Sequence, residues 1–228
     1  MPRDIGVVIV AAGRGTRFGS PVPKQYKTLA GIPVLLHAIR PFASHPEVAR
    51  IVVVVPADDA VTPPPWLDGA RGERLTLVAG GDERRHSVNA GLAALADDCV
   101  IVLVHDGARP FPARTTIDAG IAAARRGRSA VPAIPVADTV KRADDFGRVL
   151  STVDRHGLWA AQTPQAFPRA VLARAHGAPG LDELTATDDA TLVERLGEPV
   201  DLIPGSIENL KITTAHDLEL ATWYASRQ

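Results

Sequence analysis

Four short apolar segments recur in the first half of the chain, and none of them alternates with polar residues. They are rich in β-branched side chains and cover residues 7–10, 51–55, 75–78 and 100–104. Uninterrupted apolar runs of this length are typical of parallel strands that are covered on both faces. The pattern therefore predicts buried strands in a mainly parallel central sheet.

Segments with helical spacing follow three of these strands. Their apolar residues stand three or four positions apart, so that each helix presents one apolar face. The alternation of strands and helices predicts an α/β sandwich with right-handed crossovers. The residues that set the spacing are Val34, Leu35, Ala38 and Ile39, then Val88, Leu92 and Leu95, then Ile117, Ile121 and Ala124.

Two regions depart from this rhythm. Residues 56–74 include three consecutive prolines, so we expect a loop or a short helical turn there in place of a regular crossover helix. Residues 135–159 contain two extended segments around an Asp- and Gly-bearing turn at 144–147, which predicts a β-hairpin. Because this hairpin has few apolar residues of its own, we expect it to pack on a second subunit and form a homodimer.

The last third of the chain continues with helices and short strands. We find no internal repeat, low-complexity tract or linker, so we expect a single domain over residues 1–228. The predicted elements are a helix at 168–176, a helix capped near 187–189, strands at 200–203 and 210–213, and a final helix that runs to residue 228.

The charge balance narrows the possible partners. The chain has 25 basic and 26 acidic residues, and a net charge of −1 excludes a surface-wide nucleic-acid footprint or a polybasic membrane face. Its first apolar segment, at 5–12, is too short to span a membrane and lacks a signal-peptide pattern, so we expect a cytoplasmic protein. The single cysteine, Cys99, excludes an intrachain disulfide, and its apolar setting predicts an inert core thiol.

The clearest chemical signature lies at residues 10–25, directly after the first strand. Small residues there let backbone N–H groups approach an anion. Phe18 stands where a dinucleotide fingerprint needs its third glycine, and the Gly-Lys-Ser/Thr of a Walker loop is absent. A basic loop suited to a nucleoside triphosphate remains, with Arg14, Arg17 and Lys24 as cations; the alternative is a glycine turn with solvated cations.

Two further segments carry candidate chemistry. Asp106 ends the fourth strand and should face the same crevice as Gly13, where one carboxylate and substrate phosphates would hold Mg²⁺. His105 lacks a second ligand at metal spacing, so we expect it to orient a neighbour. At residues 79–88, the backbone of Gly81 and the hydroxyl of Ser87 are suited to reading a base edge; the alternative is that Asp82 only caps the helix.

Six segments in order carry a resemblance over nearly the whole chain. They are residues 23–26, 80–84, 104–110, 138–142, 152–159 and 162–165. Together they resemble the 2-C-methyl-D-erythritol 4-phosphate cytidylyltransferases of the non-mevalonate isoprenoid pathway. This resemblance implies a Rossmann-like nucleotidyltransferase sandwich, CTP and Mg²⁺, and a homodimer in which a protruding β-hairpin arm, at about 136–159, helps close the other subunit's active site.

The resemblance also implies roles for particular residues. The catalytic set would be Arg17, Lys24, Arg155 and Lys211. The nucleotide would be bound by Ala11, Ala12, Gly13, Arg14, Gly15, Gly81, Asp82 and Ser87. The acceptor would contact Asp106, Gly107, Arg109, Thr187 and Lys211, with Thr139 and Arg155 from the other subunit, and Asp106 would also serve the metal.

Two alternative functions stay open from the sequence. A related cytidylyltransferase acts on ribitol 5-phosphate and shares the nucleotide half of the chain. The second alternative is a nucleotide-sensing protein that has lost activity. The presence of Arg17, Lys24 and Asp106 argues against the second.

The scarcity of lysine generates a testable prediction. Only four of the 25 basic residues are lysines, and two of them, Lys24 and Lys211, lie in the segments described above. A compact, rotatable ammonium differs from a planar guanidinium in how it meets a phosphate. We therefore expect Lys24→Arg and Lys211→Arg each to lower turnover roughly tenfold or more, measured by steady-state kinetics. Unchanged kinetics would show that neither position requires lysine for function.

Overall fold

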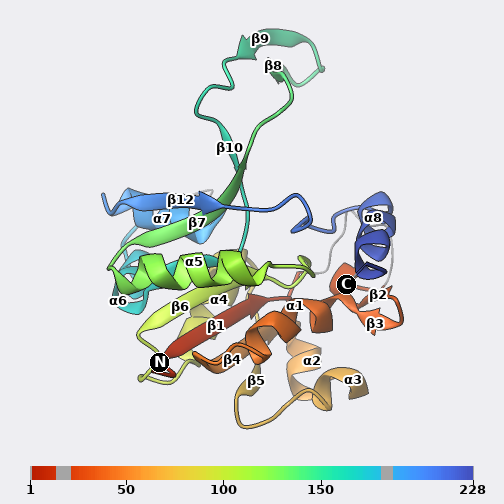
Figure 1. Cartoon of the computed structure of the whole chain (residues 1–228), viewed down its shortest axis with the longest axis vertical. Helices are drawn as coiled ribbons and strands as arrows, with labels where there is room; N and C mark the ends of the chain where they lie inside the picture. Colours follow the sequence, from red (N-terminus) through yellow and green to blue (C-terminus); the bar gives the residue numbers. More distant parts are fainter. Residues whose placement is uncertain (1, 14–21, 181–186, 228) are drawn as a thin grey trace.

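The computed structural model describes residues 2–13, 22–180 and 187–227. Within them, an eight-stranded sheet has the order β10-β7-β11-β6-β1-β4-β5, and β12 also pairs with β7 (Figure 1). The pairs among β6, β1, β4 and β5 are parallel, whereas β10 and β11 run antiparallel to their neighbours. The strands are β1 (Ile5–Val10), β4 (Val48–Val55), β5 (Leu75–Ala79), β6 (Ile101–Asp106), β7 (Ser129–Pro135), β10 (Trp159–Ala161), β11 (Gln165–Pro168) and β12 (Val200–Pro204).

The four apolar runs of the sequence form the parallel half of this sheet. Val7 of β1 stands opposite Ile51 of β4 on one side and Leu103 of β6 on the other, and all three side chains are buried. Successive residues of β1 enter different cores, because side chains alternate between the two faces of a strand. The predicted mainly parallel α/β sandwich is confirmed.

Helices cover both faces of the sheet. The first layer contains α1 (Val34–Ala43) and α5 (Arg114–Arg125), whose apolar residues join one core cluster. The second contains α4 (Arg84–Ala93), α6 (Arg169–His176) and α7 (Asp189–Arg195), which join the other. All five helices were predicted from the sequence. Asp188 is the N-cap of α7, and its side chain accepts a hydrogen bond from the Thr191 backbone N–H.

The connection at residues 56–74 is irregular, as predicted. It contains two helices of about one turn, α2 (Ala57–Val61) and α3 (Pro65–Asp68), in place of a crossover helix. An unpredicted pair of two-residue strands, β2 (Thr28–Leu29) and β3 (Ile32–Pro33), follows the short 3-10 helix η2 (Lys24–Tyr26). The last helix, α8 (Ala215–Ala225), ends before the predicted boundary at residue 228.

The predicted strand at 210–213 is wrong. These residues form no regular element and pair with no strand of the described chain, and the backbone N–H of Ile212 donates a hydrogen bond to the carbonyl of Ala108. The sequence pattern also missed β7, β10 and β11. Pro132 interrupts the apolar run of β7 and Pro135 ends it, and β10 is exposed, so neither strand produces the clean pattern of a buried strand.

The predicted hairpin is confirmed as an arm that projects away from the sheet (Figure 1). Its strands, β8 (Val140–Ala143) and β9 (Val149–Val153), are antiparallel, and Asp144 accepts backbone hydrogen bonds across the turn. Gly147 takes a positive φ of 78°, which suits glycine. Phe146 is 87% exposed at the tip, and its packing on a second subunit stays a prediction.

No helix in the described ranges is long and apolar enough to cross a membrane.

Candidate active site

The strongest candidate site is a cleft of about 680 Å³ at the carboxyl ends of β1, β5 and β6. Side chains from separate segments reach it because the carboxyl ends of parallel strands meet at one edge of the sheet. The predicted crevice that joins Gly13 to Asp106 is therefore confirmed. Of the residues expected from the sequence, the cleft is lined by Ala11, Ala12, Gly13, Lys24, Gly81, Asp82, Ser87, Asp106 and Lys211.

Buried hydrogen bonds fix the nucleotide side of the cleft. The Gln25 amide Nε2 donates to the carbonyl oxygens of Ala11 at 2.6 Å and Gly13 at 3.0 Å, which orients the backbone that follows β1. Gly80 brings the β5 end against this segment, since a Cβ there would overlap the Cβ of Ala12. Gln25 belongs to the first motif, but its role could not be assigned until its backbone partners were known.

The helix cap proposed for Asp82 is not found. The N-cap of α4 is Glu83, and its side chain makes no capping hydrogen bond. Asp82 is exposed on the cleft instead, and Ser87 is buried one turn into the helix. Both residues therefore lie where the nucleotide-binding interpretation puts them, although their contacts with a base stay a prediction.

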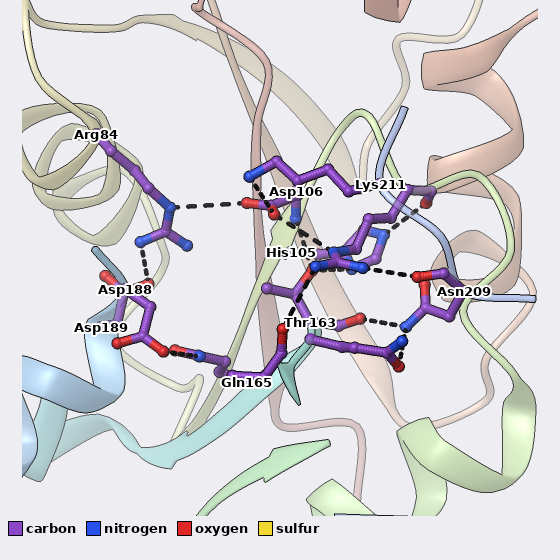
Figure 2. A network of polar contacts seen from close by, with 12 residues as sticks. Arg84, His105, Asp106, Thr163, Gln165, Asp188, Asp189, Asn209 and Lys211 are labelled. Carbon is purple, nitrogen blue, oxygen red and sulfur yellow. Dashed lines mark hydrogen bonds and ion pairs between the residues drawn. The ribbon is translucent and has the colours of Figure 1, made fainter. Parts of the chain in front are cut away.

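Asp106 is the centre of a cluster of cations (Figure 2). Its carboxylate oxygens lie 2.9 Å from Lys211 Nζ, 3.5 Å from Arg109 Nε and 3.6 Å from Arg84 Nε. Burial acts to raise the pKa of Asp106, but these three cations outweigh burial and hold the pKa below its ordinary value. The carboxylate is thus ionised at neutral pH, and the cluster keeps an excess of positive charge for polyanionic ligands.

Arg84 is a site residue to which the sequence assigned no role. Its Nη1 lies 2.6 Å from the Asp189 carboxylate, which is 1% exposed and accepts a hydrogen bond of 3.0 Å from His176 Nε2. Its Nη2 is buried without a hydrogen-bond partner. Arg84 therefore ties the end of β6 to the start of α7 and still carries a donor for a ligand.

His105 and Thr163 hold the backbone of Asp106 in place. His105 is 0% exposed, and its Nε2 lies 2.9 Å from the Arg109 carbonyl, so Nε2 carries the proton. Burial lowers the pKa of His105 to about 4, so the ring is neutral and Nδ1 accepts from the Thr163 hydroxyl at 3.0 Å. The same hydroxyl accepts from the Asp106 backbone N–H. The expectation that His105 orients a neighbour is confirmed.

Asn209 explains how Lys211 reaches the site without a strand. Its side-chain Nδ2 donates to the Thr163 carbonyl at 2.8 Å, and its backbone carbonyl accepts from Arg109 Nη1 at 2.7 Å. Asn209 is buried, so these bonds form away from water. They attach the loop that carries Lys211 to the end of β6.

Asp106 is the carboxylate at the centre of this cluster that a metal ion could use as a ligand. Within the described ranges, no group of three His, Cys, Asp or Glu residues is arranged to hold an ion. The oxygens of Asp106 already face Lys211, Arg84 and Arg109. This donor set fits an ion that takes most of its ligands from substrate phosphates, and it does not fit an ion held by the protein alone.

Several predicted site residues lie outside the cleft. Gly107 packs closely against the cleft residue Ala11, because a Cβ on Gly107 would come within 3.0 Å of the Ala11 Cβ. Arg109 does not line the cleft itself but contacts Asp106, which does. Thr187 is exposed just before α7. Thr139 and Arg155 belong to the arm and do not line the cleft of their own chain. The remaining three, Arg14, Gly15 and Arg17, are outside the described residues.

The fold, with a polar cleft at the carboxyl edge of its sheet, is that of the α/β class that includes nucleotidyltransferases. Comparison with known sequences narrows this class. The family profile that matches residues 5–227 is that of 2-C-methyl-D-erythritol 4-phosphate cytidylyltransferase, IspD. The chain belongs to this family, and the resemblance found in the sequence is confirmed.

Individual relatives agree with the family match. An enzyme of this name from Syntrophus aciditrophicus is 40% identical, covering 100% of this chain and 98% of its own. One from Streptomyces coelicolor is 44% identical, covering 100% of this chain and 87% of its own. The crystal structure of 4-diphosphocytidyl-2C-methyl-D-erythritol synthase from Anaerococcus prevotii matches with a TM-score of 0.83 and 30% identity, covering 99% of both chains.

The neutral, buried His105 predicts a pH dependence of stability. Its pKa of about 4 in the folded protein lies below the ordinary 6.5, so the unfolded chain binds more protons between these values. The free energy of unfolding should therefore fall as the pH is lowered through this window, with His105 responsible for up to about 3 kcal/mol.

Denaturant unfolding at about pH 7 and pH 5 tests this dependence. We expect His105→Gln to flatten the pH slope, because its side chain does not titrate. His216, which is exposed on α8, supplies the control variant His216→Gln, which should keep the wild-type slope. Equal slopes in the two variants would contradict the assignment.

Proposed function

We propose that this chain transfers the cytidylyl group of CTP to 2-C-methyl-D-erythritol 4-phosphate, giving 4-diphosphocytidyl-2-C-methyl-D-erythritol and pyrophosphate. Family membership supports the reaction. The observation in the structure that carries it is the group of cations from distant segments, Lys24, Arg84 and Lys211, at one cleft, with Arg109 next to them against Asp106. Two polyanionic substrates must meet in such a site.

The chemistry requires positioning and charge neutralisation more than an activated side chain. A phosphate monoester is already a nucleophile near pH 7, so the acceptor phosphate attacks the α-phosphate of CTP in line and the bond to pyrophosphate breaks. Negative charge accumulates on the α-phosphate and on the leaving pyrophosphate. We assign to Lys24 the stabilisation of this negative charge. Arg17, which lies outside the described residues, is assigned the same role.

We assign Lys211, Arg109 and Asp106 to binding of the acceptor. Asp106 holds both cations within ion-pair distance, so they are oriented before the acceptor arrives. Arg109 faces Asp106 through Nε and bonds the Asn209 backbone carbonyl through Nη1, so its guanidinium is held on both sides. Gly107 and Thr187 complete the acceptor set, and Ala11–Gly13, Gly81, Asp82 and Ser87 form the nucleotide set, as the family resemblance implies.

Mg²⁺ is the cofactor that we propose. When bound, it neutralises part of the triphosphate charge and stabilises the leaving pyrophosphate. Asp106 is the carboxylate that would hold it, with the nucleotide phosphates supplying most of the other ligands.

We further propose a cytoplasmic homodimer of single-domain subunits joined through the arm at about 136–159. Exposed apolar residues on the arm and at its base support this assembly: Phe146, Val149, Leu150, Leu158 and Trp159. A two-stranded hairpin of this kind is marginal on its own, so a partner surface would stabilise it. The arm would carry Thr139 and Arg155 to the other subunit's cleft, where Arg155 would bind the acceptor phosphate.

Pyrophosphate release by the purified protein tests the proposed reaction. We expect release with CTP and methylerythritol phosphate to be at least about a hundredfold faster than with ATP, GTP or UTP, or with ribitol 5-phosphate as acceptor. Faster pyrophosphate release with ribitol 5-phosphate than with methylerythritol phosphate would identify ribitol 5-phosphate as the acceptor. Nucleotide binding without release for any pair would identify a nucleotide-binding protein.

Arg155→Ala tests the contribution of the arm. Loss of a guanidinium that forks a phosphate should raise the KM for the acceptor roughly tenfold or more and leave the KM for CTP nearly unchanged. Arg142→Ala is the matched control, since Arg142 is an exposed arginine on the same arm.

Mixing two impaired variants, assayed at an acceptor concentration far below the KM of Arg155→Ala, shows whether Arg155 acts between subunits. In a mixed dimer of Arg155→Ala and Lys24→Ala, one cleft has a native Lys24 and receives a native Arg155. Random mixing should therefore restore activity to roughly a quarter of the wild-type value. No recovery in a sample whose subunits have exchanged would contradict action in trans.

A further inference from the structure

A second cavity lies at the opposite end of the sheet from the cleft. Its volume is about 740 Å³, within the usual range for small-molecule sites. Arg3 precedes β1, Arg50 lies near the start of β4, and Arg74 directly precedes β5, so the cavity opens where these strands begin. Arg40, near the end of α1, completes a set of four arginines in its lining.

These four arginines are not neutralised within the described chain. None of them lies within 4.0 Å of a carboxylate, although Glu73 and Asp98 also line the cavity. Other arginines of the protein are paired, for example Arg125 with Asp4 and Arg128 with Asp201. The described lining therefore holds four arginines against two carboxylates, and none of the four is ion-paired.

Backbone carbonyl groups bind three of the guanidinium groups, and one carbonyl joins two of them. Arg3 Nε and Arg74 Nη1 both donate to the carbonyl oxygen of Val48, at 3.2 and 3.3 Å. Arg74 Nη2 donates to Ala43, and Arg50 Nη1 donates to Ala49. Neutral acceptors orient these groups but leave their charges in place, and like charges this close repel one another unless an anion joins them.

The rest of the lining is apolar. Leu36, Ile39 and Ala43 come from α1, and Ile51 and Leu75 come from β4 and β5. An apolar wall beside a group of arginines matches a ligand with a hydrocarbon part and an anionic head. A phosphate offers more acceptor oxygens than a carboxylate and therefore suits several guanidinium groups at once.

We propose that this cavity binds a small amphiphilic phosphate, in which a phosphate or diphosphate group is joined to a short hydrocarbon chain. The head group contacts Arg3, Arg40 and Arg74, and the chain lies against Leu36 and Leu75. This site shares no lining residue with the cleft among the described residues, so it is independent of the proposed transfer reaction.

Amide chemical shifts of the full-length, ¹⁵N-labelled protein test the proposal, with CTP present at saturation to fill the cleft. The probes are hexyl phosphate, inorganic phosphate, hexanoate and hexanol. Hexyl phosphate should shift the amides of Ala43, Gly72 and Leu75 and bind at least about tenfold more tightly than each other probe. Equal or tighter binding of hexanoate would overturn the choice of phosphate, and shifts confined to Ala12 and Gly81 would overturn the site.

Variants locate the head group. Arg40→Gln and Arg74→Gln should each weaken hexyl phosphate binding roughly fivefold or more, whereas Arg195→Gln, a control on α7 outside the cavity, should have no effect. If Arg74→Gln fails to fold, Arg40→Gln decides the question, because Arg40 is exposed and its side chain makes no hydrogen bond in the described chain. Unchanged affinity in Arg40→Gln would then overturn the assigned position of the head group.

Discussion

The ion pairs of Asp106 are the interaction on which the site depends. One carboxylate at the end of a buried strand lies within 3.6 Å of cations from three different segments. Without it, Arg84, Arg109 and Lys211 would repel one another across a partly buried space. With it, they stay together and still present an excess of positive charge. The cleft is consequently preorganised for phosphates, which reduces the reorganisation that binding would otherwise require.

The position of Asp106 depends in turn on neutral groups below it. His105 is neutral because burial disfavours its charged form, so it accepts from Thr163 and leaves that hydroxyl directed to the Asp106 backbone. Asn209 adds a second attachment by bonding to the carbonyl of Thr163. The charged surface of the cleft thus rests on uncharged, buried hydrogen bonds, which are insensitive to salt and hold the cations in a fixed arrangement.

Sequence reasoning succeeded where a single segment carries its own signal. The runs at 7–10 and 51–55 predicted β1 and β4, and Asp106 could be placed at the end of a strand because the apolar run stops there. It failed where a segment is defined by a partner. Residues 210–213 have a strand-like pattern but no neighbouring strand, and they are held instead through Asn209 and Ala108. Arg84 was visible in a motif, but its bonds to Asp189 and Asp106 join residues far apart in the chain.

The sequence by itself determined the α/β class, the hairpin arm, the family resemblance and most of the residues that line the cleft. These follow from local patterns, since apolar spacing, turn residues and motif order are properties of contiguous segments. Only the tertiary structure decided which cations Asp106 gathers, which tautomer His105 adopts and where the cavity of four arginines opens. Each of these depends on distances and burial between segments that the chain order does not fix.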